Sequence, residues 1–411
     1  MIKKEEFSQP EITIGMVGHI DHGKTTLLSR LTGKWASTHS EEIKKGITIR
    51  LGYADAHFYK CSKCKGSDAY GTNVKCLKCG SEAKPERTVS FVDAPGHETL
   101  MATMLSGAAI MDAAILLVAA NEECPQPQTR EHVMALDIVG IKNIIIVQNK
   151  IDLVSEEDAL KNYKQIKEFV KGTVAENAPV IPVSAQHNIN VNAVIQAIEE
   201  LFKTPKRDTT KDPLMFIARS FDVNLPGITP DKLVGGVLGG SLKQGILKVG
   251  DKIELRPGKE TEGKGVWEPV FSEITSIFSG GHPVKQAGPG GSIGIQTKLD
   301  PFYVKSDSLS GCVAGHVGKL PQVYYEFNLK PTLLKRVVGT KEALAVENIK
   351  KGEILMLNVN SSATVGVVKE LKKDIVHCTL KIPVCASKED RITISRRFIN
   401  RWHLIGYANL A

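Results

Sequence analysis

The sequence contains no run of about eighteen apolar residues, so no segment is expected to cross a membrane. Its N-terminal stretch, MIKKEEFSQPEITIGMVG, is charged and lacks the apolar run and cleavage site of a secretory signal. Internal repeats and low-complexity tracts are also missing. These absences favour a cytoplasmic protein that is built from ordinary folded domains and makes no membrane contact.

The composition is that of a globular protein with more than one domain. The 411 residues are 42% hydrophobic and 24% charged, which suffices for buried cores. This length predicts roughly two to four domains. The formal charge of +8 and the pI near 8.9 favour an anionic partner such as nucleic acid. A solvated basic surface without such a partner would give the same composition.

Eight cysteines are present, and their distribution is uneven. Two CxxC pairs, Cys61 with Cys64 and Cys76 with Cys79, are separated by eleven residues within the segment 60–80. This spacing predicts a tetrahedral zinc site with four cysteine ligands, a knuckle whose metal supplies the folding energy that a small segment lacks. Two disulfides are the alternative, which a cytoplasmic protein disfavours. Four thiolates leave no open coordination position, so the Zn²⁺ site is expected to be structural.

The first half of the sequence alternates between short apolar runs and helical patterns. Apolar strands followed by helices predict an α/β domain with a mostly parallel sheet and helices on both faces. The strands are expected at residues 12–18, 89–92, 114–119, 143–148 and 180–184, and the helical patterns lie at 25–33, 156–172 and 191–202.

The second half has a different character. Residues 203–213 are charged and proline-bearing, as in a linker, and the helical period disappears beyond them. Glycine, proline and short alternating strands then recur to the C-terminus, which predicts two antiparallel β-barrels. We therefore expect an α/β domain at residues 1–204, a first barrel at 208–324 and a second barrel at 325–411.

A phosphate-binding loop follows the first strand. Residues 18–25, GHIDHGKT, fit the pattern G-x-x-x-x-G-K-[ST] between a strand and a helix. The glycines let successive backbone N–H groups point at phosphate oxygens, Lys24 can reach the β- and γ-phosphates, and Thr25 can ligate Mg²⁺. A glycine-rich turn before a helix is the alternative. The phosphate-binding residues expected here are Asp21, His22, Gly23, Lys24, Thr25 and Thr26.

Two further loops are expected to hold the γ-phosphate and Mg²⁺. Asp93 and Gly96 lie in DAPG after the strand VSFV, where the carboxylate can hold the Mg²⁺ shell and the Gly96 N–H can meet the γ-phosphate. Thr48, in KKGITIR, is the candidate second Mg²⁺ ligand, with an ordinary strand residue as its alternative role. His97 is placed to orient the attacking water. Lys24, Thr48 and His97 form the expected catalytic set.

The segment NKID predicts which base is bound. Asp152 can accept hydrogen bonds from both N1–H and N2–H₂ of guanine, and it would repel adenine. Asn149 would join this loop to the phosphate loop, and Lys150 would pack along the ring. The order of all these motifs predicts GTP or GDP with Mg²⁺ as the ligand. The loop expected to complete the site, with a backbone N–H to O6, comprises Ser184, Ala185 and Gln186.

The motifs VGHIDHGKTTL, GITI, DAPGHE, NKID and SAQ resemble those of the translational GTPases. The resemblance covers the whole chain, because these factors carry two β-barrels after the GTP-binding domain, or G domain. The two CxxC pairs, the segment 121–136 and the stretch 219–258 look most like the gamma subunits of archaeal and eukaryotic initiation factor two. The resemblance implies a GTPase that binds initiator methionyl-tRNA in its GTP form, delivers it to the small ribosomal subunit and leaves after hydrolysis.

The resemblance also implies partners. Members of this family form a heterotrimer with an alpha subunit on the second domain and a beta subunit on the G domain. A GTPase-activating factor is expected, because no arginine finger is visible near the motifs. Basic residues of the two β-domains form a candidate electrostatic footprint for tRNA. They are Arg219, Lys243, Lys248, Lys252, Arg256, Arg396, Arg397 and Arg401.

Two other classes share some of these features. An elongator tRNA carrier and the selenocysteine-specific factor have the same nucleotide motifs, although the latter carries an extra C-terminal domain. A non-translational module could use GTP as a structural ligand or assembly switch, with the knuckle as its docking site. Intact Gly23, Lys24, Thr25, Thr48 and His97 argue against a hydrolytically dead module. A P-loop metallochaperone would lack the two β-barrels.

Overall fold

The computed structural model describes residues 9–33, 52–93, 105, 110–225, 227–261, 265–280, 282–337, 345–398 and 401–411. Within these ranges no helix is long and apolar enough to cross a membrane. The chain divides into two compact units. One is formed mainly by Pro10–Pro205, and the other by Lys206–Lys335 and Val346–Ala411 together with Gln9.

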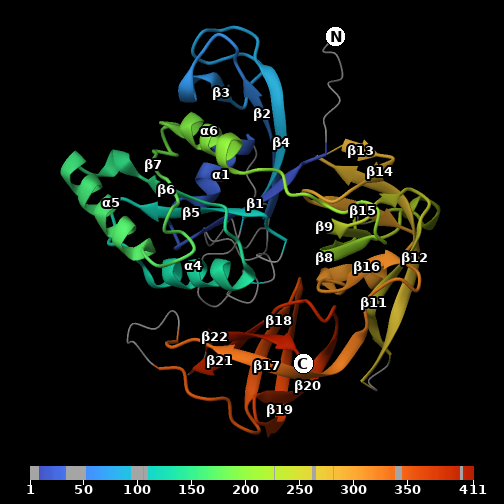
Figure 1. The fold of residues 1–411 in the computed structure, drawn as a ribbon. Helices are drawn as coiled ribbons and strands as arrows, with labels where there is room; N and C mark the ends of the chain where they lie inside the picture. The colour runs from blue at the N-terminus through green and yellow to red at the C-terminus, as the bar shows by residue number, and fades with distance from the viewer. Residues whose placement is uncertain are drawn as a thin grey trace. The chain divides into compact units, whose positions relative to one another are not determined.

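A seven-stranded sheet forms the centre of the first unit (Figure 1). Its strands lie in the order β3-β2-β4-β1-β5-β6-β7. The last five of these run parallel, while β2 pairs antiparallel with β4, and β3 with β2. The predicted mostly parallel sheet is confirmed, with an antiparallel edge that the apolar runs did not indicate. The strands are β1 (Ile12–Gly18), β2 (Gly52–Lys60), β3 (Tyr70–Gly71), β4 (Lys84–Asp93), β5 (Ala113–Ala119), β6 (Ile144–Asn149) and β7 (Val180–Pro182).

Helices cover both faces of this sheet, as predicted. On one face, Leu28 of α1 and Ile198 of α6 pack with Ile14 of β1 in a single apolar core. On the opposite face, Gln148 of β6 donates a hydrogen bond of 2.9 Å to Asn162 Oδ1 of α5. Figure 1 shows α1 and α6 on one side of the sheet and α4 on the other. The helices are α1 (Lys24–Thr32), α4 (Pro127–Val139), α5 (Glu156–Val170) and α6 (Val191–Leu201).

Helix α4 was not indicated by apolar periodicity. It begins at Pro127, a favourable residue for a first helical turn, and ends before Gly140, whose φ of 89° suits a left-handed C-cap. Its buried side chains include those of Thr129, Glu131 and His132. Because polar residues occupy part of the buried face, the apolar period that identifies most surface helices is weak here.

The second unit contains two antiparallel barrels. In the first, six strands form the ring β11-β16-β8-β9-β15-β12, which the pairing of β11 with β12 closes. Ile253 and Leu255 of β11 and Ile277 of β12 point into its core. The short β10 and β14 pair separately. The strands are β8 (Leu214–Phe221), β9 (Val237–Gln244), β10 (Leu247–Lys248), β11 (Lys252–Thr261), β12 (Val266–Ser279), β13 (His282–Val284), β14 (Gln286–Ala287), β15 (Ile293–Thr297) and β16 (Val313–His316).

The second barrel is closed by six strands in the order β17-β20-β19-β18-β21-β22. Every neighbouring pair is antiparallel, and Phe327, Leu357, Ile394 and Ile405 are buried together inside. Both predicted antiparallel barrels are therefore present. The strands are β17 (Val323–Leu333), β18 (Ile354–Val359), β19 (Ser362–Lys372), β20 (Ile375–Cys385), β21 (Ile392–Phe398) and β22 (Arg401–Leu410).

Polar contacts join the two barrels to each other. Lys243 of the first barrel lies 3.4 Å from Asp390 of the second. Arg256 donates to the carbonyl oxygens of Leu320 and Pro321, at 3.5 Å and 3.3 Å, in the connection between the barrels. Some basic side chains of this unit therefore hold its own architecture together.

Candidate functional site

The loop of residues 18–25 is a tight turn between β1 and α1. Gly18 and Gly23 have φ angles of 141° and 90°. A Cβ atom at Gly23 would lie 2.3 Å from Asn149 Nδ2, and one at Gly18 would lie 2.4 Å from the carbonyl oxygen of Leu117. Only glycine fits both positions, so the backbone curls tightly against the neighbouring loops. This is the geometry that a phosphate cradle requires.

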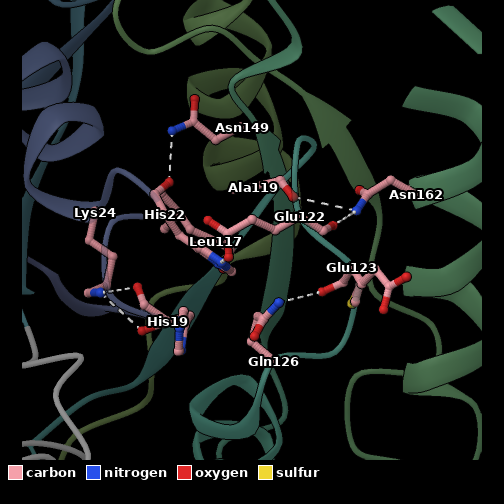
Figure 2. Close-up of polar contacts among 12 residues, drawn as sticks. His19, His22, Lys24, Leu117, Ala119, Glu122, Glu123, Gln126, Asn149 and Asn162 are labelled. Atoms are coloured by element: carbon pink, nitrogen blue, oxygen red, sulfur yellow. Dashed lines mark hydrogen bonds and ion pairs between the residues drawn. The ribbon is translucent and has the colours of Figure 1, made fainter. Parts of the chain in front are cut away.

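Lys24 is buried at the start of α1 and points back along the loop. Its Nζ donates hydrogen bonds to the carbonyl oxygens of Gly18 and His19, at 3.0 Å and 2.7 Å (Figure 2). Burial is the main cause that lowers the pKa of Lys24 to about 8, while the carboxylates of Asp93 and Asp21 act to raise it. The ammonium group is thus held inside the loop, where an anionic ligand would favour its charged form.

Thr25 and Asp93 bring two oxygen ligands together from distant parts of the chain. Asp93 is the last residue of β4 and is fully buried, and Thr25 lies in the first turn of α1. The Thr25 hydroxyl donates a hydrogen bond of 2.9 Å to Asp93 Oδ2. A hydroxyl and a carboxylate beside a phosphate loop form a donor set that suits Mg²⁺. These two residues fit the cation that the motif predicts.

Asn149 ties three loops into one structure at the end of β6. Its Nδ2 donates a hydrogen bond of 2.9 Å to the carbonyl oxygen of His22 in the phosphate loop (Figure 2). Its Oδ1 accepts a hydrogen bond of 3.0 Å from the backbone N–H of Ala185 in the SAQ loop. Arg30 of α1 supports the same loop by donating to the carbonyl oxygens of Ala185 and Gln186, at 3.0 Å and 2.6 Å.

The Asp152 carboxylate follows this junction on an exposed turn. Lys150 adopts a left-handed conformation with φ 63°, which starts the turn. A hydrogen bond from the buried Ser184 side chain is the main cause that lowers the pKa of Asp152, and His187, 3.6 Å away, acts in the same direction. Asp152 is therefore ionised at neutral pH and accepts hydrogen bonds without donating any, as recognition of a guanine edge requires.

Three of the predicted site residues, Thr48, Gly96 and His97, lie outside the described residues. The other predicted nucleotide-site residues lie at the C-terminal ends of β4 and β6, in the first turn of α1, or on the loops that follow β1, β6 and β7. In a parallel sheet these loops share one edge, where the ligands of such folds bind.

The four predicted zinc ligands come together. Cys61 and Cys79 have their Sγ atoms 3.5 Å apart, Cys64 and Cys76 have theirs 3.7 Å apart, and all four Sγ atoms lie within 4.8 Å of one another. Around a zinc ion with bonds of about 2.3 Å, tetrahedral sulfur ligands lie about 3.8 Å from one another. Four mutually close sulfur atoms match one tetrahedral ion better than two separate disulfides.

The backbone of the knuckle supports this geometry. The Cys61 N–H donates to the carbonyl oxygen of Ala69 at 2.7 Å, and the Cys76 N–H donates to that of Ser81 at 2.9 Å. Apolar support is small, because among the described residues the buried cluster around these cysteines contains only Tyr59 and Ala83 besides the cysteines themselves, and both flank the knuckle. Such a segment depends on its metal for stability.

The eight candidate tRNA residues fall into two groups. Arg219 pairs with Asp307 at 3.0 Å, and Arg256 pairs with Glu254 at 2.6 Å. Arg396 pairs with Glu353, and Lys243 pairs with Asp390 as described above. These four support the barrels. The remaining four are exposed on the surface, namely Lys248, Lys252, Arg397 and Arg401.

Sequence reasoning missed three residues that support the nucleotide loops. Arg30 holds the SAQ loop, and Glu122 and His132 contact the phosphate loop from outside it. The side chain of His132 accepts a hydrogen bond of 2.8 Å from the N–H of Gly18. Glu122 and His132 fall within the segment 121–136, which was notable only for its resemblance to a family. No local pattern predicts such contacts.

Comparisons with known proteins agree with this architecture. The family described as Elongation factor Tu GTP binding domain matches residues 9–204, and Elongation factor Tu domain 2 matches residues 235–304. The family Initiation factor eIF2 gamma, C terminal, matches residues 325–410. A G domain with a phosphate loop, followed by two antiparallel barrels, makes the chain a translational GTPase, for which GTP or GDP and Mg²⁺ are the general ligands.

Relatives over nearly the full length narrow the assignment. The chain is 58% identical to the translation initiation factor 2 gamma subunit of Methanothermobacter thermautotrophicus, over 97% of this chain and 98% of the relative. It is 56% identical to that of Pyrococcus furiosus, over 99% of both chains. The chain therefore belongs to the family of translation initiation factor 2 gamma subunits, and is a GTP-dependent initiation factor subunit.

Solved structures with a similar fold include two elongation factors. A bacterial selenocysteine-specific elongation factor, EF-Sec, has a TM-score of 0.72 at 24% identity, and the match covers 98% of this chain. The chain spans only 58% of the length of that factor. Elongation factor SelB from Methanococcus maripaludis, in complex with the GTP analogue GppNHp, has a TM-score of 0.70 at 23% identity. This match covers 99% of this chain and 79% of the SelB chain. At this identity the likeness concerns the fold alone.

Proposed function

We propose that the chain binds initiator methionyl-tRNA in its GTP form, delivers it to the small ribosomal subunit and leaves after GTP is hydrolysed. The observation that carries the proposal is the full-length similarity to initiation factor 2 gamma subunits, combined with nucleotide loops that fit together. An elongator carrier would share the loops, but the segments that resemble the gamma subunits favour initiation.

The nucleotide chemistry follows from the residues at the edge of the sheet. Asp152 accepts from the guanine edge, Asn149 fixes the base loop against the phosphate loop, and Lys24 neutralises the β- and γ-phosphates. Thr25 and Asp93 would hold Mg²⁺, which supplies positive charge between the phosphate oxygens when it is bound. Phosphoryl transfer then depends mainly on positioning and on charge stabilisation.

The switch and the water-positioning group are assigned from the sequence. Thr48 would grip the cation only while the γ-phosphate is present, and Gly96 would contact that phosphate. His97 would orient the attacking water. His97→Ala should keep the nucleotide affinity and lose stimulated hydrolysis, as single-turnover assays with ribosomes can measure. A full stimulated rate in this variant would remove His97 from the mechanism.

The cysteine cluster is proposed to hold one structural Zn²⁺. Four thiol sulfur atoms that lie within 4.8 Å of one another would fill all four positions of a tetrahedral ion, so the ion would act in folding and not in catalysis. In sequence, the knuckle lies between Thr48 and Asp93, so its surface is tethered to both switch segments. Its location allows it to present a recognition surface that depends on the nucleotide state.

The partners are proposed from the family. The chain would form a heterotrimer with an alpha subunit and a beta subunit in the cytoplasm, and an activating factor would stimulate hydrolysis. We also propose domain boundaries at residues 1–204, 208–324 and 325–411, which the three family matches support.

A competition binding assay tests the central proposal. Protein loaded with a non-hydrolysable GTP analogue would be offered labelled initiator methionyl-tRNA against elongator methionyl-tRNA and uncharged initiator tRNA, with GDP-loaded protein as the control. We expect tight binding of the charged initiator alone, lost with GDP. Equal binding of the elongator tRNA would assign the chain to the carrier class. If nothing binds, the assay is repeated with the alpha subunit, and a second failure would overturn the proposal.

A further inference from the structure

The side chain of His22 is buried behind the phosphate loop and is held at several points. Only 1% of the residue surface is exposed. Ring atom Nδ1 lies 3.0 Å from the carbonyl oxygen of Leu117, and Nε2 lies 3.3 Å from Glu122 Oε2. The backbone oxygen of the same residue accepts the hydrogen bond from Asn149. A change in the hydrogen bonds of the ring therefore alters the position of the His22 backbone, which is part of the phosphate loop.

Each of the two ring contacts requires an N–H donor from the imidazole. Both Leu117 O and an ionised Glu122 carboxylate are acceptors, whereas a neutral imidazole has only one N–H to donate. A doubly protonated ring can satisfy both, and a neutral ring must give up one. Burial is the main cause that lowers the pKa of His22, so the neutral ring prevails near neutral pH. Glu122, whose side chain is 31% exposed, is the partner that can turn away into water.

The backbone that carries Glu122 is firmly placed. Asn162 of α5 donates a hydrogen bond of 2.8 Å from Nδ2 to the carbonyl oxygen of Glu122 (Figure 2). The same amide lies 3.4 Å from the carbonyl oxygen of Ala119, at the end of β5, and its Oδ1 accepts from Gln148. Because Asn162 fixes the main chain, only the Glu122 side chain has to move when its contact with the ring is made or lost.

Other titratable groups near the ring come from two elements. His19, in the same loop, has its ring centroid 5.2 Å from that of His22, and it opposes protonation. His132 of α4 is buried, and burial lowers its pKa to about 3, so it stays neutral. The Lys24 ammonium belongs to the same loop and bonds to its carbonyls. Glu122 is the group whose charge favours the protonated ring.

We propose that Glu122 is a positioning residue for guanine nucleotide, which acts through the ring of His22 on the phosphate loop and slows nucleotide release while the contact is made. The inference rests on the assignment of residues 18–26 to the phosphates. Glu122 itself reaches no reacting atom. Its effect is to hold the His22 peptide, and hence the loop, in the geometry that Asn149 also holds.

Two substitutions of Glu122 separate this role from a structural one. In Glu122→Gln, the side-chain amide can donate to the Nε2 lone pair of a neutral ring whose Nδ1–H still donates to Leu117. That variant needs no extra proton and should keep the contact at every pH. In Glu122→Ala the contact is lost at every pH. Glu123→Gln is the matched control, because Glu123 is adjacent and exposed, and its carbonyl oxygen makes the contact with Gln126.

The experiment measures the dissociation rate of a fluorescent GDP analogue from the full chain between about pH 5 and about pH 8. As the pH falls and the ring gains its second proton, the wild type should move toward Glu122→Gln, which should release GDP about tenfold more slowly than Glu122→Ala. Near the upper limit, the wild type should approach Glu122→Ala and release GDP about tenfold faster than Glu122→Gln. Glu123→Gln should follow the wild type throughout. Thermal unfolding at each pH confirms that every variant is folded.

The outcomes distinguish this inference from the proposed function. Ratios between the three proteins that stay constant with pH, or equal rates in all of them, would overturn the role of Glu122. Failure of the wild type to bind the GDP analogue at any pH would instead overturn the assignment of the phosphate loop. The inference is supported if the dissociation rate of the wild type moves from that of Glu122→Gln toward that of Glu122→Ala as the pH rises.

Discussion

Thr25 and Asp93 are separated by 68 positions in the sequence, yet the hydroxyl of one donates a 2.9 Å hydrogen bond to the carboxylate of the other. The contact joins the first turn of α1 to the end of β4, because β1 and β4 are parallel neighbours in the sheet. Two hard oxygen ligands therefore face each other beside the buried Lys24. The fold thus brings together the two oxygen donors of the proposed cation site from segments that lie far apart in the sequence.

Asp93→Asn should weaken Mg²⁺-dependent GTP binding. The amide keeps the size of the side chain but removes the charge that attracts the cation, and we expect a loss on the order of tenfold. Equilibrium titrations of GTP at graded Mg²⁺ concentrations measure this. Asp137→Asn, an exposed charge on α4, is the control. The difference from the wild type should disappear in the presence of a chelator, and its persistence there would count against a role in holding Mg²⁺.

Asp152→Asn should exchange the preference for guanine for a preference for xanthine. An asparagine amide can donate to the carbonyl at C2 of xanthine, whereas it meets the N2 amino group of guanine unfavourably. Discrimination built on such hydrogen bonds reaches on the order of 10⁴. Competition between GTP and XTP for the loaded protein measures the change. A variant that still prefers GTP would show that the base is recognised elsewhere.

Cys76→Ser should release the metal and loosen the knuckle alone. Zinc content should fall from about one ion per chain toward none, and hydrogen exchange should rise at residues 61–83. The strands β1 and β5 should keep their protection, because their core is separate from the small cluster under the cysteines. Cys124→Ser, outside the cluster, is the control and should keep the metal. Retention of zinc by Cys76→Ser would remove Cys76 from the ligand set.

His132 should make the folded protein sensitive to acid. Burial lowers the pKa of His132 to about 3, so the folded chain keeps the ring neutral, while an unfolded chain protonates it near 6.5. Its contribution to stability is therefore complete above pH 6.5 and is lost as the pH falls from 6.5 toward 3. At pH 5 the loss amounts to about 2 kcal/mol.

His132→Asn provides the comparison for that pH dependence. The Asn Oδ1 can accept the N–H of Gly18 in place of Nδ1, and it does not titrate. Chemical denaturation at about pH 7.5 and pH 5 should show a smaller loss of unfolding free energy in the variant than in the wild type. An equal loss in both proteins would assign the acid sensitivity to other groups.

Exposed and ion-paired basic residues of the barrels should differ in their effects on tRNA binding and on stability. Lys252→Ala removes an exposed charge and should weaken tRNA binding, with a salt dependence that is shallower by about one unit. Arg219→Ala breaks a partly buried pair with Asp307 and should lower stability by about 1 kcal/mol, with little change in the salt dependence. Filter binding over a range of salt concentrations tests both. If Arg219→Ala weakened tRNA binding and Lys252→Ala did not, the tRNA would instead bind at the paired arginines.

The sequence predicted those sites whose functional residues lie close together along the chain. A phosphate loop needs its glycines and Lys24 within eight consecutive positions, and two CxxC units place four thiols close together with little help from the rest of the chain. The alternation of apolar runs with helices predicted the parallel sheet, since the burial of both faces leaves a continuous apolar signal. Helix α4 was not predicted, because polar side chains occupy part of its buried face and weaken the apolar period.

Tertiary structure alone decided which polar side chains meet. Nothing in the sequence sorts Arg256, which binds the carbonyls between the barrels, from Lys252 four positions earlier, which is exposed. Nothing in it pairs His22 with Glu122, since 100 positions separate them in the chain and their contact depends on β1 lying beside β5. The types and spacing of residues determined what this protein can bind. The packing of strands and helices determined which side chains hold the binding loops in place, because such contacts have no local period.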